Sequence, residues 1–162
     1  MIRVGALFAL ALSLISCDDD GISGDGNGSG ASCYDGACAT RDIPFSDAID
    51  APTLTDVTLE CQSLSIVVLA TATDPQGSSN LQDVIQTIGV FPNVECQGAQ
   101  IIVQDDFAGS GVEESFGDAF LAAANQALYD QICACDSWPV QVQLEDADGN
   151  VTSGRVVARV TR

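Results

Sequence analysis

The sequence predicts a mainly β fold: an antiparallel sandwich over residues 54–162 that carries one inserted helix. Apolar and polar side chains alternate with period two in several segments rich in β-branched residues, which is typical of half-buried strands. Turn-forming residues separate these segments. The chain has 162 residues, which is enough for one domain of ordinary size and an additional tail.

The first sixteen residues have the order of a cleaved secretory signal. A basic residue precedes apolar residues 4–15, and a small residue precedes Cys17. The apolar run is too short for a membrane-spanning helix, which needs about 20 residues. The ending Leu14-Ile15-Ser16-Cys17 resembles the lipobox of bacterial lipoproteins. That resemblance implies cleavage after residue 16, lipidation of Cys17, and attachment to a membrane of the bacterial cell envelope. The alternative is an ordinary signal followed by a coincidental cysteine.

Residues 17–32 are expected to form a lipidated cysteine and a flexible tether. Asp, Gly, Ser and Asn dominate residues 18–32, and such a segment cannot bury enough apolar surface to fold. Its typical end-to-end distance is about 20 Å. The tether therefore separates the domain from the lipid headgroups.

Six cysteines remain after Cys17, and an even number in an exported chain indicates disulfides. Cys33 and Cys38 enclose an Asp-Gly turn, so a local clip is expected within an extended segment, residues 33–53. Cys133 and Cys135 are too close in sequence to pair with each other without strain. A thiolate metal site is the less favoured alternative because no CxxC pair is present.

The two remaining cysteines are Cys61 and Cys96. Strand directions in an antiparallel sandwich place both at the same end as Cys133 and Cys135. Each is therefore expected to bond to one member of that pair.

The sequence predicts strands over residues 64–73, 84–91, 101–103, 140–146 and 156–160. Residues 81–88 also have the i, i+3, i+4, i+7 spacing of a helix, but β-branched residues favour the strand. Apolar residues at four-residue steps in an Ala-rich stretch predict a helix over about 119–133.

Two turns carry a resemblance at the level of the fold. Residues 70–77 look like the end of the second strand of bacterial immunoglobulin-like domains, and residues 146–152 look like their last hairpin. The resemblance implies an immunoglobulin-like sandwich and says nothing of activity.

The sequence also predicts how the two strands of the last hairpin pair. A three-residue loop, Asp148–Asn150, would pair Val142 with Val156 and keep both inward rows apolar. Asn150 would then take the left-handed conformation.

The charge balance excludes several function classes. The chain has 23 acidic residues against five arginines, no lysine and no histidine, for a formal charge of −18. Catalytic triads with histidine, His-ligated zinc, Schiff-base lysines and P-loops are therefore excluded. Nucleic-acid binding is also excluded, because it depends on a basic surface.

Calcium is the only ligand that the loop carboxylates suggest. Asp146, Asp148 and Asn150 begin like an EF-hand, but Val151 and Val157 stand where that loop needs Gly and Glu. A hairpin turn is the favoured interpretation. A looser calcium site that includes Asp74 stays open.

These observations predict a non-enzymatic, lipid-anchored envelope protein with a binding or structural role and no required cofactor. Its expected partner is another envelope protein or a surface component. The first alternative is a calcium-dependent binding or adhesion module. The weaker one is a carboxylate-based hydrolase that uses Asp105-Asp106 and Glu113-Glu114.

Overall fold

The structure is a computed structural model that describes residues 33–107, 114–121 and 125–162. The predicted signal, Cys17 and the tether lie outside the described residues. Seven strands and one α-helix follow in the chain, together with a short 3-10 helix, η1. They are β1 (Thr53–Gln62), β2 (Ser65–Thr73), η1 (Ser78–Leu81), β3 (Ile85–Val90), β4 (Ile101–Asp106), β5 (Glu114–Leu121), α1 (Gln126–Ala134), β6 (Ser137–Glu145) and β7 (Val151–Thr161).

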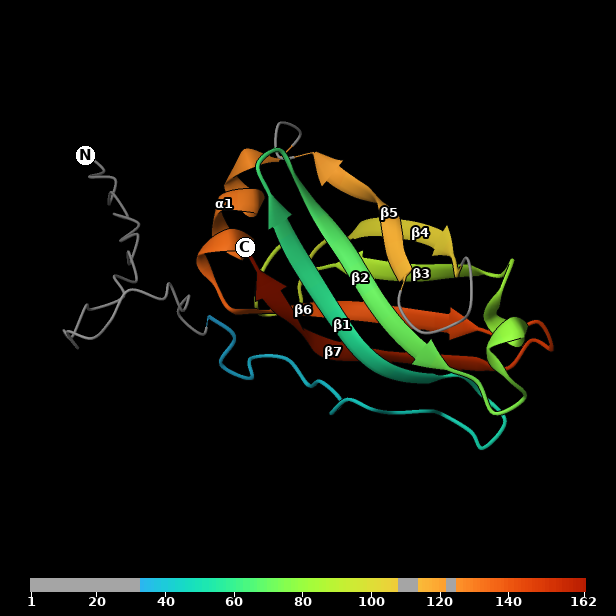
Figure 1. Cartoon of the computed structure of the whole chain (residues 1–162). Helices are drawn as coiled ribbons and strands as arrows, with labels where there is room; N and C mark the ends of the chain where they lie inside the picture. Colours follow the sequence, from blue (N-terminus) through green and yellow to red (C-terminus); the bar gives the residue numbers. More distant parts are fainter. Residues whose placement is uncertain (1–32, 108–113, 122–124) are drawn as a thin grey trace, which may run out of the picture.

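The strands form one sheet in the order β4-β3-β6-β7-β1-β2-β5. The mainly β prediction is confirmed, but the sheet is mixed rather than wholly antiparallel, because β1 runs parallel to β7. In Figure 1, β1 and β2 cross in front of β3 and β6. The two ends of the order, β4 and β5, contact each other without pairing, so the sheet is close to a closed barrel.

The core lies between the facing parts of this sheet. In β2, the side chains at alternate positions are fully buried from Ile66 to Ala72, and β6 repeats the pattern from Trp138 to Leu144. Inward apolar residues of β7 complete this core. The period-two pattern thus identified the buried faces of β2, β6 and β7.

The helix is shorter than the sequence predicts. It begins at Gln126, residues 119–121 belong to β5, and residues 122–124 lie outside the described residues. β5 pairs with β2, so strand pairing overrides the local helix preference of this Ala-rich stretch. By contrast, the predicted strand over 84–91 is confirmed as β3.

The last hairpin has a longer loop than predicted. Glu145 pairs with Val151, and Val142 therefore faces Gly154 rather than Val156. The shift is by an even number of residues, so the inward face is the predicted one. Gly149, and not Asn150, has the positive φ, at 84°.

The six described cysteines form three disulfides: Cys33–Cys135, Cys38–Cys96 and Cys61–Cys133. Their Cα–Cα distances are 5.4, 5.8 and 5.9 Å, respectively. The bond between Cys61 and Cys133 is of the predicted kind. The predicted clip between Cys33 and Cys38 is wrong, and Cys96 bonds to neither Cys133 nor Cys135.

The path of the N-terminal segment explains the difference. Arg41 pairs in parallel with Val156, and its N–H donates to the Arg155 carbonyl at 2.7 Å. The segment thus runs along the edge of β7 and brings both of its cysteines to the end of the molecule that carries the other four. We call this end, with α1 and the three disulfides, the disulfide end.

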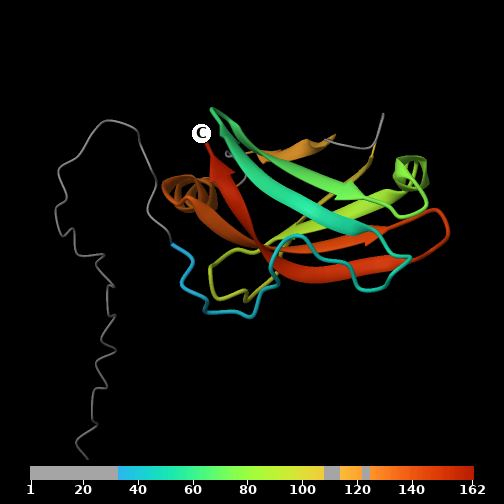
Figure 2. The same ribbon diagram turned by 60° about the horizontal axis from the view of Figure 1, so that its bottom comes forward.

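The opposite end is made of turns, and Figure 2 shows them at the right of the molecule. It carries residues 46–52, 74–84 and 146–150, which precede or follow the strands there. We call it the loop end. The first described residue, Cys33, lies at the disulfide end, so the N-terminal segment joins the domain far from the loop end (Figure 1).

Candidate functional site

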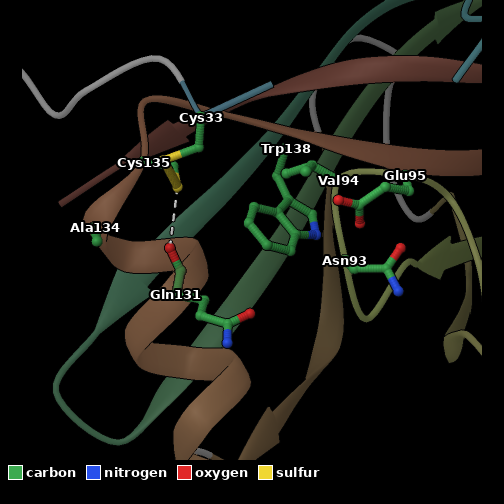
Figure 3. Close-up of a pocket in the computed structure, with 8 residues that line it drawn as sticks. All are labelled: Cys33, Asn93, Val94, Glu95, Gln131, Ala134, Cys135 and Trp138. Carbon is green, nitrogen blue, oxygen red and sulfur yellow. Dashed lines mark hydrogen bonds between the residues drawn. A yellow bond between two sulfur atoms is a disulfide. The ribbon is translucent and has the colours of Figure 1, made fainter. Parts of the chain in front are cut away.

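A pocket of about 500 Å³ opens at the disulfide end, between α1 and the loop that follows β3 (Figure 3). Its apolar wall is formed by Trp138, Val94, Ala134 and the Cys33–Cys135 disulfide. Three polar residues complete the lining: Asn93, Glu95 and Gln131. In Figure 3 the side chain of Gln131 lies on the helix side of the indole, and those of Asn93 and Glu95 lie on the loop side.

Hydrogen bonds fix the floor and the loop of this pocket. The Trp138 indole N–H donates to the Phe91 carbonyl at 2.9 Å, so the ring stays aligned under the loop. The Asn93 amide donates to the Gln97 carbonyl and accepts from the Gln97 N–H, both at 3.0 Å. The Asn93 side chain is thus used by its own loop, which leaves Gln131 and Glu95 as the polar groups nearest to a bound molecule.

The lining of this pocket is mainly apolar and holds few ionisable groups. Both of its cysteines are oxidised in one disulfide, and Glu95 is the one carboxylate among the lining residues. Neither a nucleophile with a base nor a pair of facing carboxylates is present among them. The pocket has the volume and apolar character of a site for a small molecule.

The sequence identified two residues of this pocket, Cys33 and Cys135, as disulfide cysteines, but it assigned them other partners. Trp138, which forms the floor, is buried. The pocket itself could not be predicted, because its walls come from segments around residues 33, 94 and 134. The disulfide that joins Cys33 to Cys135 closes it.

The predicted calcium residues lie at the loop end, where their side chains form hydrogen bonds with the loops. The Asp146 carboxylate accepts from the Asn150 N–H at 2.7 Å, the Asn150 side-chain amide at 2.8 Å and the Asp148 N–H at 3.0 Å. The Asp148 carboxylate accepts from the Asn80 amide at 3.2 Å. Asp74 accepts from the Gln76 N–H at 2.8 Å within its own turn.

No group of three or more Cys, Asp or Glu side chains is arranged as metal ligands within the part of the chain that the structure describes. Asp146, Asp148 and Asn150 share one loop, but Asp74 stays in a separate turn. The bonds within the 146–150 loop match the hairpin-turn interpretation of this motif.

The surroundings of Asp146 lower the pKa of its carboxyl group. Burial opposes ionisation of this carboxyl group, but the hydrogen bonds from Asn150, Asp148 and Gly149 outweigh it and hold the pKa below its usual value. Asp47 also has a lowered pKa, because the Ser153 N–H and the Arg41 guanidinium both donate to its carboxylate. Both carboxylates therefore stabilise the folded loops in their ionised form.

Of the carboxylates predicted for a hydrolase, the structure describes the side chains of Asp105 and Asp106 alone. Asp105 and Asp106 are consecutive in β4, where they pair with Gln86 and Ile85. The Asp106 N–H donates to the Asp105 carboxylate at 2.9 Å. Glu113 lies outside the described residues, and of Glu114 only the backbone position in β5 is described.

Comparisons with protein-family models, with curated proteins and with solved structures give no match for this chain. In the described segments, no helix has both the length and the apolar character that crossing a bilayer requires.

Proposed function

We propose that this protein is a non-enzymatic, lipid-anchored component of the bacterial cell envelope that binds a partner through an immunoglobulin-like domain. The observation that carries the proposal is the pairing of all six described cysteines. Disulfides persist in oxidising compartments outside the cytoplasm, where a secretory signal delivers a chain. The lipobox at Cys17 adds the anchor, because Cys17 is the one cysteine outside these pairs.

The strand pairing supports the immunoglobulin-like part of the proposal. In such sandwiches, strands A, B, E and D form one sheet, strands C, F and G form the other, and a variable-type domain adds C′ beside C. Here β1, β2 and β5 pair in the order A-B-E, and β4, β3, β6 and β7 pair in the order C′-C-F-G. The parallel contact between β1 and β7 joins the two groups into one sheet.

The point at which the N-terminal segment joins the domain supports the anchored arrangement. The N-terminal segment joins the domain at the disulfide end, so a lipid at Cys17 would leave the loop end free (Figure 1). A tether with an end-to-end distance of about 20 Å allows the domain to turn above the headgroups. A binding role needs such a free surface.

Metabolic labelling with a fatty-acid analogue tests the anchor. The wild-type protein is expected to incorporate the label, and Cys17→Ser is expected to incorporate none and to keep its signal or leave the membrane. A Ser16→Ala variant, which keeps a small residue before the cysteine, is the matched control and should label normally. Undiminished label in Cys17→Ser would remove the lipoprotein part of the proposal.

A further inference from the structure

The Trp138 pocket has one charged side chain in its lining, Glu95, and its other polar side chains are neutral amides. Arg162 also reaches the disulfide end. Its guanidinium donates to the carbonyls of Cys133 and Cys135, at 2.5 and 2.6 Å, and it is not among the residues that line the pocket. Among the described residues, the pocket therefore offers a bound molecule one carboxylate and no cation.

The Glu95 carboxylate is available to a ligand. The side chain is exposed, and no hydrogen bond or ion pair occupies its carboxylate within the part of the chain that the structure describes. In Figure 3 this carboxylate points toward the Trp138 indole, whereas the Asn93 amide points away from the ring. The negative charge thus lies beside the apolar floor, which is the arrangement that an apolar ligand with one charged end requires.

The apolar part of the lining gives room for the body of such a ligand. Val94, Ala134 and the Cys33–Cys135 disulfide line the pocket around the indole. The cavity of about 500 Å³ lies within the usual range for small-molecule sites. The formal charge of the chain, −18, favours a positive ligand, because a negative field attracts cations and repels anions. An apolar molecule that carries positive charge therefore matches both properties of the pocket.

We propose that the Trp138 pocket binds a small organic cation: a protonated amine on an aliphatic or aromatic body. The ammonium group donates to the Glu95 carboxylate, and the apolar body lies against Val94 and Ala134 above the indole. A carboxylate or phosphate ligand is disfavoured, because it would meet Glu95 with no described cation in the lining to offset the repulsion. This inference adds a ligand site to the proposed function and does not depend on acylation of Cys17.

Trp138 is the one tryptophan of the chain, so its fluorescence reports directly on the pocket. The full-length protein in a neutral maltoside detergent is titrated with cyclohexylmethylamine and excited at a wavelength that tyrosine does not absorb. N-acetyltryptophanamide in the same detergent corrects for quenching outside the pocket. We expect a saturable change in emission. Binding should be at least fivefold weaker for cyclohexylmethanol, which lacks the charge, and for methylamine, which lacks the apolar body.

Two variants separate the two parts of the site. Glu95→Gln should weaken binding of the amine at least fivefold and leave binding of the alcohol unchanged, because it removes only the charge. Ala134→Leu should weaken binding of both at least fivefold, because the larger side chain fills the pocket. Asp130→Asn is the matched control: it removes a charge from an exposed side chain of α1 outside the lining, and it should bind the amine as the wild type does. Thermal unfolding within a few degrees of the wild type checks that each variant is folded.

Three outcomes would overturn the proposal. The first is a titration with the amine that gives neither a saturable change in emission nor a heat of binding by calorimetry. The second is equal affinity for the amine and the alcohol, which would assign the pocket to neutral apolar molecules. The third is equal weakening by Glu95→Gln and Asp130→Asn, which would trace binding to the overall charge. None of them affects the fatty-acid labelling of Cys17, so the two proposals are judged separately.

Discussion

Gln86 joins β3 to β6 at the point where their backbone pairing ends. Its side chain is fully buried, and its amide donates to the Glu145 carbonyl at 2.9 Å and to the Val84 carbonyl at 3.0 Å. Its carbonyl oxygen accepts from the Glu145 N–H at 2.9 Å. One side chain thus replaces the backbone partners that Glu145 would otherwise lack.

We predict that Gln86→Leu lowers the free energy of unfolding by about 2–3 kcal/mol, since leucine fills a similar volume but leaves the buried groups of Glu145 unpaired. Urea denaturation followed by circular dichroism measures the change. Gln104→Leu is the matched control, because Gln104 is exposed on β4 and bonds to Thr87 at the surface. A loss of the same size in both variants would contradict the role given to Gln86.

The lowered pKa of Asp146 predicts how the stability of the fold changes at acidic pH. Because its pKa in the folded protein is lowered, its contribution to stability is complete above the unfolded pKa of about 3.9 and is lost as the pH falls through the lower folded value. Asp146→Asn should therefore flatten the loss of stability below about pH 4 and cost about 1–2 kcal/mol at pH 7.

Thermal unfolding at several pH values between 2 and 7 measures both effects. Asp148→Asn is the control, because that side chain is exposed and accepts one bond from Asn80. If the stability of Asp146→Asn falls as steeply at acidic pH as that of the wild type, then other carboxylates cause the loss of stability in acid.

At the scale of elements, two disulfides tie α1 and the N-terminal segment separately to the rest of the fold, and a third, Cys33–Cys135, joins the two to each other. The Cys61–Cys133 bond ties the end of β1 to α1, and the Tyr129 hydroxyl adds a bond of 2.6 Å to the Gln62 carbonyl. The Cys38–Cys96 bond ties the N-terminal segment to the loop after β3.

We predict that Cys61→Ala with Cys133→Ala lowers the stability by about 2–4 kcal/mol. It should remove hydrogen-exchange protection in α1 while the segment around Arg41 stays protected. Cys38→Ala with Cys96→Ala should do the reverse. The same loss of protection in both variants would mean that the two elements unfold together.

The elements also show how far the sequence determines this fold. Period two identified the buried faces of β2, β6 and β7, because alternation is a local property of each strand. The parallel contact of β1 with β7 and the replacement of helix by β5 depend on distant partners, so no local pattern predicts them. The predicted bond between Cys33 and Cys38 is wrong for the same reason, because the true partner of each lies far away in the sequence.

The candidate site shows the same division. Asp146 and Asn150 were identified as a loop motif, and their bonds with each other are local. The Trp138 pocket is assembled from segments far apart in the sequence, and only the fold brings them together.

The whole molecule carries far more negative charge than its ion pairs offset. Two ion pairs are present in the described part of the chain, Arg41–Asp47 and Arg159–Asp56, and both are largely exposed. Such pairs contribute about 0–1 kcal/mol each. Repulsion among the remaining carboxylates therefore dominates the electrostatics of the fold.

We predict that the melting temperature rises as sodium chloride increases from 10 mM to 0.5 M, because salt screens this repulsion. Differential scanning calorimetry measures it. A variant with exposed Asp50, Asp83 and Asp148 changed to asparagine should respond less. A melting temperature that falls with salt would mean that the two ion pairs outweigh the repulsion.

The disulfide pattern constrains the order of folding in a chain that is exported as we propose. The partners are 58 to 102 residues apart, and β1 cannot pair with β7 until that C-terminal strand has been made. Cys33 and Cys38 would enter the oxidising compartment before the other four paired cysteines, and neither is the native partner of the other. A bond formed between them at that stage would have to be rearranged by thiol–disulfide exchange before the domain is complete.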